Sequence, residues 1–235
     1  MRVILFGATG MLGSGVLLEC LDDPQIDTVV SIVRRATGRT HPKLQEHVVD
    51  DFLDYVPVCE HFAGADATFY CLGVSSVGMK EADYRRITHD FTLAAAKEIK
   101  AESPFSTFCF ISGAGTDGTG RGSVMWARVK GETENDVAKM GFKAAYMFRP
   151  GYIQPLRGAR SKTALYQGIY NVVGVLYPLF KAMAPNAVTT TVDLARAMIE
   201  AAVTGAPKAV LETPDINRLA QQYAQRRGLA GPSVT

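Results

Sequence analysis

The first chemistry that the sequence suggests is phosphate binding, by a glycine-rich turn near the N-terminus. Gly7, Gly10 and Gly13 stand three residues apart, between the apolar run 2–6 and a stretch of helical periodicity. Glycine permits a tight turn and a close approach of backbone to a pyrophosphate, and the helix start offers free N–H groups. We predict cofactor contacts from Gly7, Thr9, Gly10, Met11, Leu12 and Gly13. The spacing is G-x-x-G-x-x-G rather than the dinucleotide fingerprint G-x-G-x-x-G, so a plain turn that needs glycine for packing is the alternative.

A pair of arginines follows the second expected strand, about 20 residues beyond the glycines. In an NAD site this position holds an acid for the ribose hydroxyls, whereas here Arg34 and Arg35 occupy it. A guanidinium group suits the 2′-phosphate that distinguishes NADP from NAD. We therefore predict NADP as the cofactor in preference to NAD, with a solvated basic loop as the alternative.

Further candidate contacts come at the ends of the third and fourth expected strands. Asp51 precedes Phe52, where a carboxylate suits either an adenine amino group or the cap of the next short helix. Cys71 and Leu72 end the fourth strand, and Gly73 follows. Small residues here leave room for a cofactor to lie across the strand ends.

Alternating strand and helix patterns supply the frame that must position these residues. Strands are expected over 2–6, 27–33, 46–52, 66–72, 106–111 and 142–148, with long helices over 81–101 and 123–140. This alternation predicts an α/β fold with a doubly wound parallel sheet. Such sheets bind ligands outside the carboxyl ends of their strands, where the candidate residues fall.

Composition and motifs exclude several other classes of function. The net charge of +2 is spread along the 235 residues, so no nucleic-acid partner is implied. The four histidines show no metal-ligand spacing, and neither a G-x-S-x-G elbow nor a G-K-[ST] phosphate loop occurs. Three of the four cysteines lie in apolar surroundings and are expected as buried thiols, and a reducing cytoplasm is the expected location.

Several segments together resemble the short-chain dehydrogenase/reductase superfamily. They are G-A-T-G-M-L-G at 7–13, V-R-R at 33–35, V-D-D-F at 49–52, C-L-G at 71–73, F-I-S-G-A at 110–114, V-K-G-E-T-E at 129–134 and F-R-P-G-Y-I at 148–153. The resemblance is greatest to atypical, extended members of the NAD-dependent epimerase/dehydratase kind, which include NmrA-like and Tat-interacting oxidoreductase-like proteins. It implies a Rossmann sheet, and it places Pro150 and Gly151 near the nicotinamide amide.

The same resemblance implies a catalytic serine and a Tyr-x-x-x-Lys pair on the following helix. Lys130 fits the lysine, which binds the nicotinamide ribose, and Ser112 fits the serine, although one alignment places Gly113 there. Four residues before Lys130 stands Trp126, on the face where the tyrosine belongs. An indole N–H only donates hydrogen bonds and releases no proton near neutral pH. Candidate substitutes for the tyrosine are Tyr84, Tyr146 and Tyr152. A Lys130–Glu134 pair on a solvated helix face is the alternative for the lysine.

The pattern changes after residue 150. An apolar helix is expected over 164–183, a second helix over 192–203, a strand over 209–211 and a last helix over 215–225. We predict one domain over 1–235, in which residues 152–227 contribute a small cap over the substrate. The apolar segment holds Gln167, Asn171, Lys181 and Pro178, so it is a poor membrane span. Tyr166, Ile169, Tyr170 and Val173 indicate an apolar or aromatic small-molecule substrate.

Two functions from different classes fit these residues. The first is an NADP-dependent oxidoreductase or epimerase that acts on a small molecule. The second is an NADP(H)-binding sensor or interaction protein without turnover, which Trp126 favours. A structural domain with an empty cleft leaves Gly10 and the paired arginines unexplained. Pairing into a homodimer, which is common in the superfamily, is compatible with the sequence.

Overall fold

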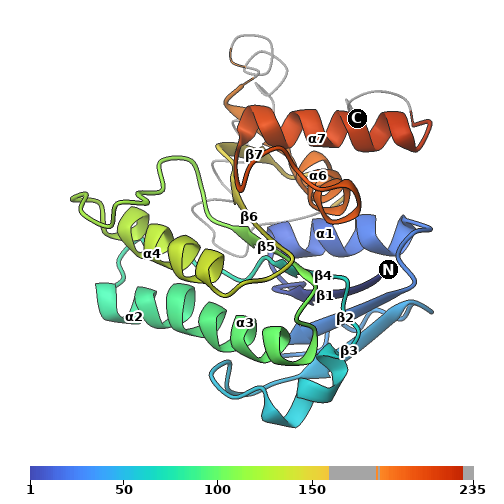
Figure 1. Ribbon diagram of the computed structural model, residues 1–235, viewed down its shortest axis with the longest axis horizontal. Coiled ribbons are helices and arrows are strands. Elements are labelled where there is room, and N and C mark those ends of the chain that lie inside the picture. Colours follow the sequence, from blue (N-terminus) through green and yellow to red (C-terminus); the bar gives the residue numbers. More distant parts are fainter. Residues whose placement is uncertain (159–183, 185, 230–235) are drawn as a thin grey trace.

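A parallel sheet forms the centre of the computed structural model, which describes residues 1–158, 184 and 186–229. The seven strands lie in the order β3-β2-β1-β4-β5-β6-β9 (Figure 1). Their bounds are β1 Arg2–Phe6, β2 Thr28–Val33, β3 Leu44–Val48, β4 Ala67–Tyr70, β5 Thr107–Ile111, β6 Ala144–Arg149 and β9 Val210–Glu212. All neighbouring pairs are parallel, so the carboxyl ends share one edge. This arrangement confirms the predicted doubly wound Rossmann-like α/β fold.

Helices cover both faces of the sheet (Figure 1). One layer contains α1 (Met11–Asp22), α6 (Thr191–Thr204) and α7 (Thr213–Arg226). The other contains α2 (Glu81–Arg85), α3 (Phe91–Glu102) and α4 (Met125–Lys139), together with a short 3-10 helix at Val56–Phe62. A π-helical turn, Arg86–Asp90, joins α2 to α3, so the expected helix over 81–101 is continuous but locally widened.

The strand pattern of the sequence explains why helices occupy both faces. Successive side chains of a strand point to opposite faces of a sheet. In β1, Val3 and Leu5 therefore join the core beneath α1 and α6, whereas Ile4 and Phe6 join the core beneath α3. All four side chains are fully buried. A strand that is apolar at every position is thus the expected sequence for this central place.

Two boundaries differ from the sequence-based prediction in a way that affects the site. The third strand is Leu44–Val48 and not 46–52, because the chain turns after Val48. The Asp51 carboxylate accepts a hydrogen bond from the Leu53 N–H at 3.0 Å, which closes that turn. The fourth strand ends at Tyr70, so Cys71 and Leu72 lie in the loop beyond it.

Residues 188–226 belong to the main packing of the domain. Strand β9 extends the central sheet beside β6, and α6 packs against both α1 and α7. A two-stranded sheet of β7 (Tyr152–Gln154) and β8 (Val188–Thr190) was not expected from the sequence. The expected apolar helix at 164–183 lies outside the described residues, so a substrate cap over 152–227 stays a prediction. No helix within the described ranges is long and apolar enough to cross a bilayer.

Candidate functional site

The glycine turn between β1 and α1 has a geometry that requires glycine at two positions. Gly7 has a φ of +83°, and a Cβ on it would lie 2.7 Å from the backbone of Cys71 and Leu72. A Cβ on Gly13 would lie 2.1 Å from the Gly7 carbonyl oxygen. These two glycines therefore allow close packing of the turn on the loop after β4 and on α1. Packing accounts for both glycines, and cofactor contact by them stays a prediction.

Gly10 is different, because packing does not require it. It is the N-cap of α1 with an extended backbone, and a Cβ on it would meet only the Gly7 carbonyl oxygen, at 3.3 Å. No side chain caps α1, and no acid lies in its first turn. The first N–H groups of a helix have no acceptor inside it. The start of α1 therefore presents free donors and a partial positive charge to an anion.

A pocket of about 360 Å³ opens directly in front of this turn. It brings together the glycine turn, the end of β2 and the loop after β4. The predicted cofactor residues among its lining are Gly7, Thr9, Gly10, Met11, Arg34, Phe52, Cys71, Leu72 and Gly73. A Cβ on Gly73 would meet no atom within 4 Å. The structure thus brings residues from four separate segments to one cavity, and cofactor binding by them stays a prediction.

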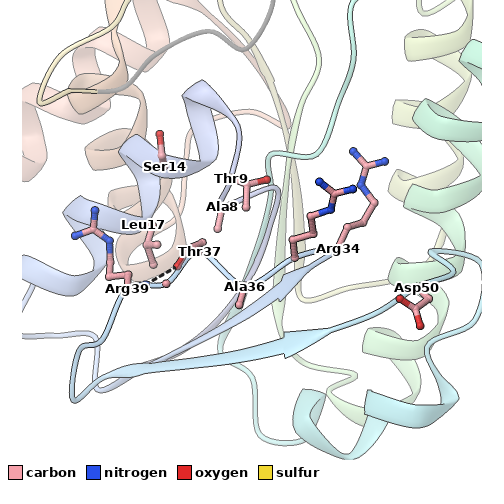
Figure 2. Close-up of a pocket in the computed structure, with 11 residues that line it drawn as sticks. Ala8, Thr9, Ser14, Leu17, Arg34, Ala36, Thr37, Arg39 and Asp50 are labelled. Carbon is pink, nitrogen blue, oxygen red and sulfur yellow. Dashed lines mark hydrogen bonds between the residues drawn. The ribbon is translucent and has the colours of Figure 1, made fainter.

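A second pocket, of about 1100 Å³, adjoins the first and shares Thr9 and Arg34 with it. Its lining includes Arg35 and Arg39, and the arginines at 34, 35 and 39 are all exposed. Figure 2 shows Arg34 and Arg39 on two sides of this pocket, with Ala8 and Thr9 of the glycine turn between them. Within the described part of the chain these guanidinium groups form no ion pair. Their exposure suits them to contact with an anionic ligand.

The acidic residue that lines the second pocket is one position earlier in the chain than the predicted Asp51. Asp50 lines the pocket, whereas the Asp51 side chain is engaged in the turn with Leu53. The N-cap of the following 3-10 helix is Tyr55, and the Asp54 carboxylate just before it accepts the Val56 N–H at 3.0 Å. Asp51 is therefore not the cap of that helix, and adenine contact by Asp51 stays a prediction. Phe52 is buried and forms part of the floor of the smaller pocket.

Ser112 follows β5, and its hydroxyl is turned toward a buried ion pair. It donates to Glu134 of α4 and lies 3.2 Å from the Phe148 carbonyl oxygen. Arg149 Nε donates to both oxygens of Glu134, at 2.9 and 3.2 Å. The hydroxyl predicted to polarise a substrate is thus committed to Glu134 in this structure, and a role for it in catalysis stays a prediction.

Lys130 reaches the same strand end from α4. Its Nζ donates to the carbonyl oxygens of Ser112 at 2.7 Å and of Ile111 at 3.2 Å. Burial lowers the pKa of Lys130 to about 8, and the neighbouring Glu134 carboxylate opposes this shift. A solvated pair of Lys130 and Glu134 is wrong, because Glu134 is only 3% exposed and binds Arg149. Two of the three ammonium protons are used, which leaves one for a ligand.

Trp126 lies one helical turn before Lys130, beside the loop after β5. A Cβ on Gly113 would be 3.9 Å from the indole, and a Cβ on Gly115 would be 3.7 Å from it. Both distances are ordinary van der Waals contacts, so the ring packs beside this loop without requiring glycine there. The tyrosines considered as substitutes are engaged elsewhere: Tyr84 is 2% exposed, the Tyr146 hydroxyl accepts the Ala206 N–H, and the Tyr152 hydroxyl donates to Gln154.

The Pro150–Gly151 turn is fixed by backbone contacts on both sides. The Pro150 carbonyl oxygen accepts the Ala114 N–H at 2.9 Å. The Gly151 N–H donates to Thr213 Oγ1 at 2.8 Å, and a Cβ on Gly151 would lie 2.4 Å from the Ala187 carbonyl oxygen. Packing therefore explains the glycine here, and contact with a nicotinamide amide stays a prediction.

Some residues of the site were missed from the sequence. They line the two pockets between the end of β2, the start of α1 and the loop after β4: Ala8, Ser14, Leu17, Ile32, Val33, Ala36, Thr37, Gly38, Arg39, Asp50, Val74 and Ser75. The basic pattern R-R-x-x-x-R at 34–39 could have indicated Arg39. No group of three or more metal-binding side chains was found among the residues described here.

Comparison with curated proteins gives relatives of similar length but modest identity. The chain is 29% identical over 165 residues to Protein FMP52, mitochondrial, of Saccharomyces cerevisiae, and covers 69% of each chain. It is 28% identical over 204 residues to Protein fmp52-2, mitochondrial, of Neosartorya fischeri, and covers 84% of each. No family model matches the chain. These relatives are named as mitochondrial proteins, so the cytoplasmic location expected from the sequence is wrong.

Solved structures share the fold at low identity. A UDP-N-acetylglucosamine 4-epimerase from Methanobrevibacter ruminantium superposes with a TM-score of 0.64 and 14% identity, covering 97% of this chain and 82% of that one. The WbmF enzyme of Bordetella bronchiseptica, in complex with NAD⁺, gives 0.61 and 14%, covering 98% and 79%. A short chain dehydrogenase family protein of Francisella tularensis gives 0.60 and 15%, covering 87% and 91%. The chain thus has the Rossmann-like fold of short-chain dehydrogenases and epimerases.

Proposed function

We propose that this protein binds NADP(H) and acts as an oxidoreductase or epimerase of the short-chain dehydrogenase/reductase type on a small molecule. The observation that carries the proposal is the pair of adjoining pockets, which joins the glycine turn to three exposed arginines. The fold shared with an NAD⁺ complex supports a nicotinamide dinucleotide. The resemblance to NmrA-like and Tat-interacting proteins remains a finer expectation within that superfamily.

The residues present fit such a cofactor. The uncapped start of α1 suits the pyrophosphate, and the open space at Gly73 leaves room across the strand ends. Arg34 and Arg35 supply guanidinium groups for a 2′-phosphate. When bound, the nicotinamide would supply hydride transfer. The third proton of Lys130 would then bind the nicotinamide ribose.

Calorimetric titration with NADPH, NADP⁺, NADH and NAD⁺ tests the proposal. We expect both phosphorylated forms to bind more tightly than the other two. A hydrogen bond to a charged group contributes about 1.5–3 kcal/mol. Arg34→Ala or Arg35→Ala should therefore weaken NADPH about 10- to 150-fold and leave NADH unchanged. Arg86→Ala, which removes an exposed arginine from the opposite helix layer, is the control. The proposal is refuted when none of the four dinucleotides binds.

A second function, NADP(H) binding without turnover, is favoured by two observations. Trp126 stands where a proton donor is expected, and the Ser112 hydroxyl is committed to Glu134. A sensor of this kind would distinguish oxidised from reduced NADP in the titration. Measured turnover on an aldehyde, ketone or nucleotide-sugar panel would exclude it.

A further inference from the structure

A buried carboxylate lies directly behind the predicted reaction centre. Glu134 is 3% exposed and receives hydrogen bonds from Arg149 and from the Ser112 hydroxyl. Arg149 also lies 3.6 Å from Glu212, so its charge is shared between two acids. A buried ion pair of this kind is weak evidence for stability, because desolvation offsets the attraction between its charges. A positional role is the alternative that the neighbouring contacts support.

Ser112 links this ion pair to Lys130. Its hydroxyl donates to Glu134, and its carbonyl oxygen accepts the Lys130 ammonium at 2.7 Å. Its N–H donates to the Phe148 carbonyl oxygen at 2.8 Å, which fixes the peptide on β6. A shift of the Glu134 carboxylate would therefore move the serine that holds the ammonium.

Glu134 also acts on Lys130 through its charge. The two residues are four apart on α4, so their side chains share one face of the helix. An opposite charge within about 4–6 Å favours the charged form of a group by 1–3 pKa units. Here the Glu134 carboxylate raises the pKa of Lys130, against the lowering caused by burial.

Groups from β5, from the residue after it and from β6 also surround the Lys130 ammonium. From β5 come the Ile111 carbonyl oxygen and the Phe110 ring, whose centroid lies 5.8 Å from Nζ, and the Ser112 carbonyl oxygen follows directly after the strand. From β6 comes Arg149, which competes for Glu134. Among the described residues, Glu134 is the charged group that acts on the pKa of Lys130.

We propose that Glu134, held by Arg149 and by the Ser112 hydroxyl, is a positioning residue that keeps the Lys130 ammonium charged and aimed at the cofactor. The proposal rests on the function proposed above, because it assigns Lys130 to that cofactor. It predicts that the charge of Glu134, rather than its packing, controls the protonation state of Lys130.

Competitive acetylation of the full-length protein with acetic anhydride, without cofactor, tests this proposal. The pH dependence of Lys130 labelling gives its pKa, and the plateau at high pH gives its accessibility, with exposed Lys97 as the internal reference. Glu134→Gln should lower the pKa of Lys130 by about one unit, which makes labelling near pH 7 about 5-fold faster at an unchanged plateau. Glu132→Gln, which alters an acid of the same helix that pairs with Arg85, should leave it unchanged.

Loosening of the structure would give the opposite result. A hydrated Lys130 returns toward the usual lysine pKa, and its plateau rate rises. An unchanged or raised pKa in Glu134→Gln therefore overturns the proposal. If that variant does not fold, Arg149→Met provides the test, because Glu134 then acts on Lys130 without a competing cation. A raised pKa at an unchanged plateau supports the proposal, and any other result overturns it.

Cofactor protection separates this proposal from the function on which it rests. Where calorimetry shows NADPH binding, NADPH should slow acetylation of Lys130 at least about 10-fold, as expected for an amine that loses its free form in a ligand contact. Absence of protection overturns the cofactor-directed role of Lys130. Absence of binding by all four dinucleotides refutes the proposed function, while the Glu134→Gln shift still reports on the residue pair.

Discussion

Replacement of Gly13 by alanine should destabilise the folded protein and not merely weaken the binding of its ligand. The new Cβ would lie 2.1 Å from the Gly7 carbonyl oxygen and 2.9 Å from the Ala8 nitrogen. Carbon contacts are optimal near about 3.5–4.0 Å, so α1 must move away from the turn by roughly an ångström. Overpacking costs about 1–3 kcal/mol, and rigid backbone on both sides places this site at the upper end.

Alanine also favours a helix over glycine by about 1 kcal/mol, which offsets part of that cost. The net loss is therefore about 2 kcal/mol, or a melting temperature lower by about 4–8 °C for a domain of this size. Thermal unfolding followed by circular dichroism measures it. A variant that melts with the wild type would refute the packing argument for Gly13.

Gly10→Ala provides the matched comparison on the same turn. Its Cβ meets one atom at 3.3 Å, and its φ of −86° suits any residue. Stability should fall by less than about 1 kcal/mol. The methyl group would occupy the pocket that Gly10 lines, so NADPH affinity should fall at least about 10-fold, as for 1.4 kcal/mol. An equal decrease in melting temperature in both variants would show that the turn tolerates neither substitution. It would remove the distinction between Gly13 as required for packing and Gly10 as required for binding.

Three further predictions concern other parts of the chain. Thr190→Ala removes the N-cap of α6, whose hydroxyl accepts the Asp193 N–H at 2.9 Å; urea unfolding should show a loss of about 1 kcal/mol, and Thr190→Ser should restore it. Burial and the nearby His61 lower the pKa of His47, so the unfolded chain binds more protons below about pH 6.5. Stability should therefore fall as the pH falls through that value, and His47→Gln should flatten this part of the pH curve; an identical curve would contradict the assignment. Trp126→Tyr should raise turnover if the missing acid limits the reaction, because general acid catalysis contributes about 10²–10⁴-fold; no change in a substrate panel would show that another group donates the proton.

Local pattern was sufficient for most of the fold. The apolar runs 2–6 and 106–111 correspond to β1 and β5. The glycine turn after the first of these runs leads into the start of α1, as predicted. The predicted third strand extends too far, because Val49 and Phe52 are apolar but lie after the strand and pack into the core from the loop. Burial of a loop residue gives the same pattern as burial of a strand residue, so the sequence alone does not separate them.

The candidate site was predictable where its chemistry is local. Gly10 and Arg34 could be placed at one cavity because Gly10 lies in the turn after β1 and Arg34 follows directly on β2. The hydrogen bonding of the Ser112 hydroxyl could not be predicted, because its partner Glu134 lies 22 residues away and is bound to Arg149. A glutamate in V-K-G-E-T-E looks solvated when only the helix is considered, and its burial depends on the register of α4 against β6.

The place of Trp126 has a practical consequence for work on this protein. The chain contains one tryptophan, and its indole borders the loop after β5, beside the predicted reaction centre. Intrinsic fluorescence therefore originates at a single known position and needs no label. Emission from this ring would respond to a nicotinamide nearby by energy transfer and to rearrangement of the loop by a change in polarity. Unknown ligands can thus be screened by light emitted from the site itself.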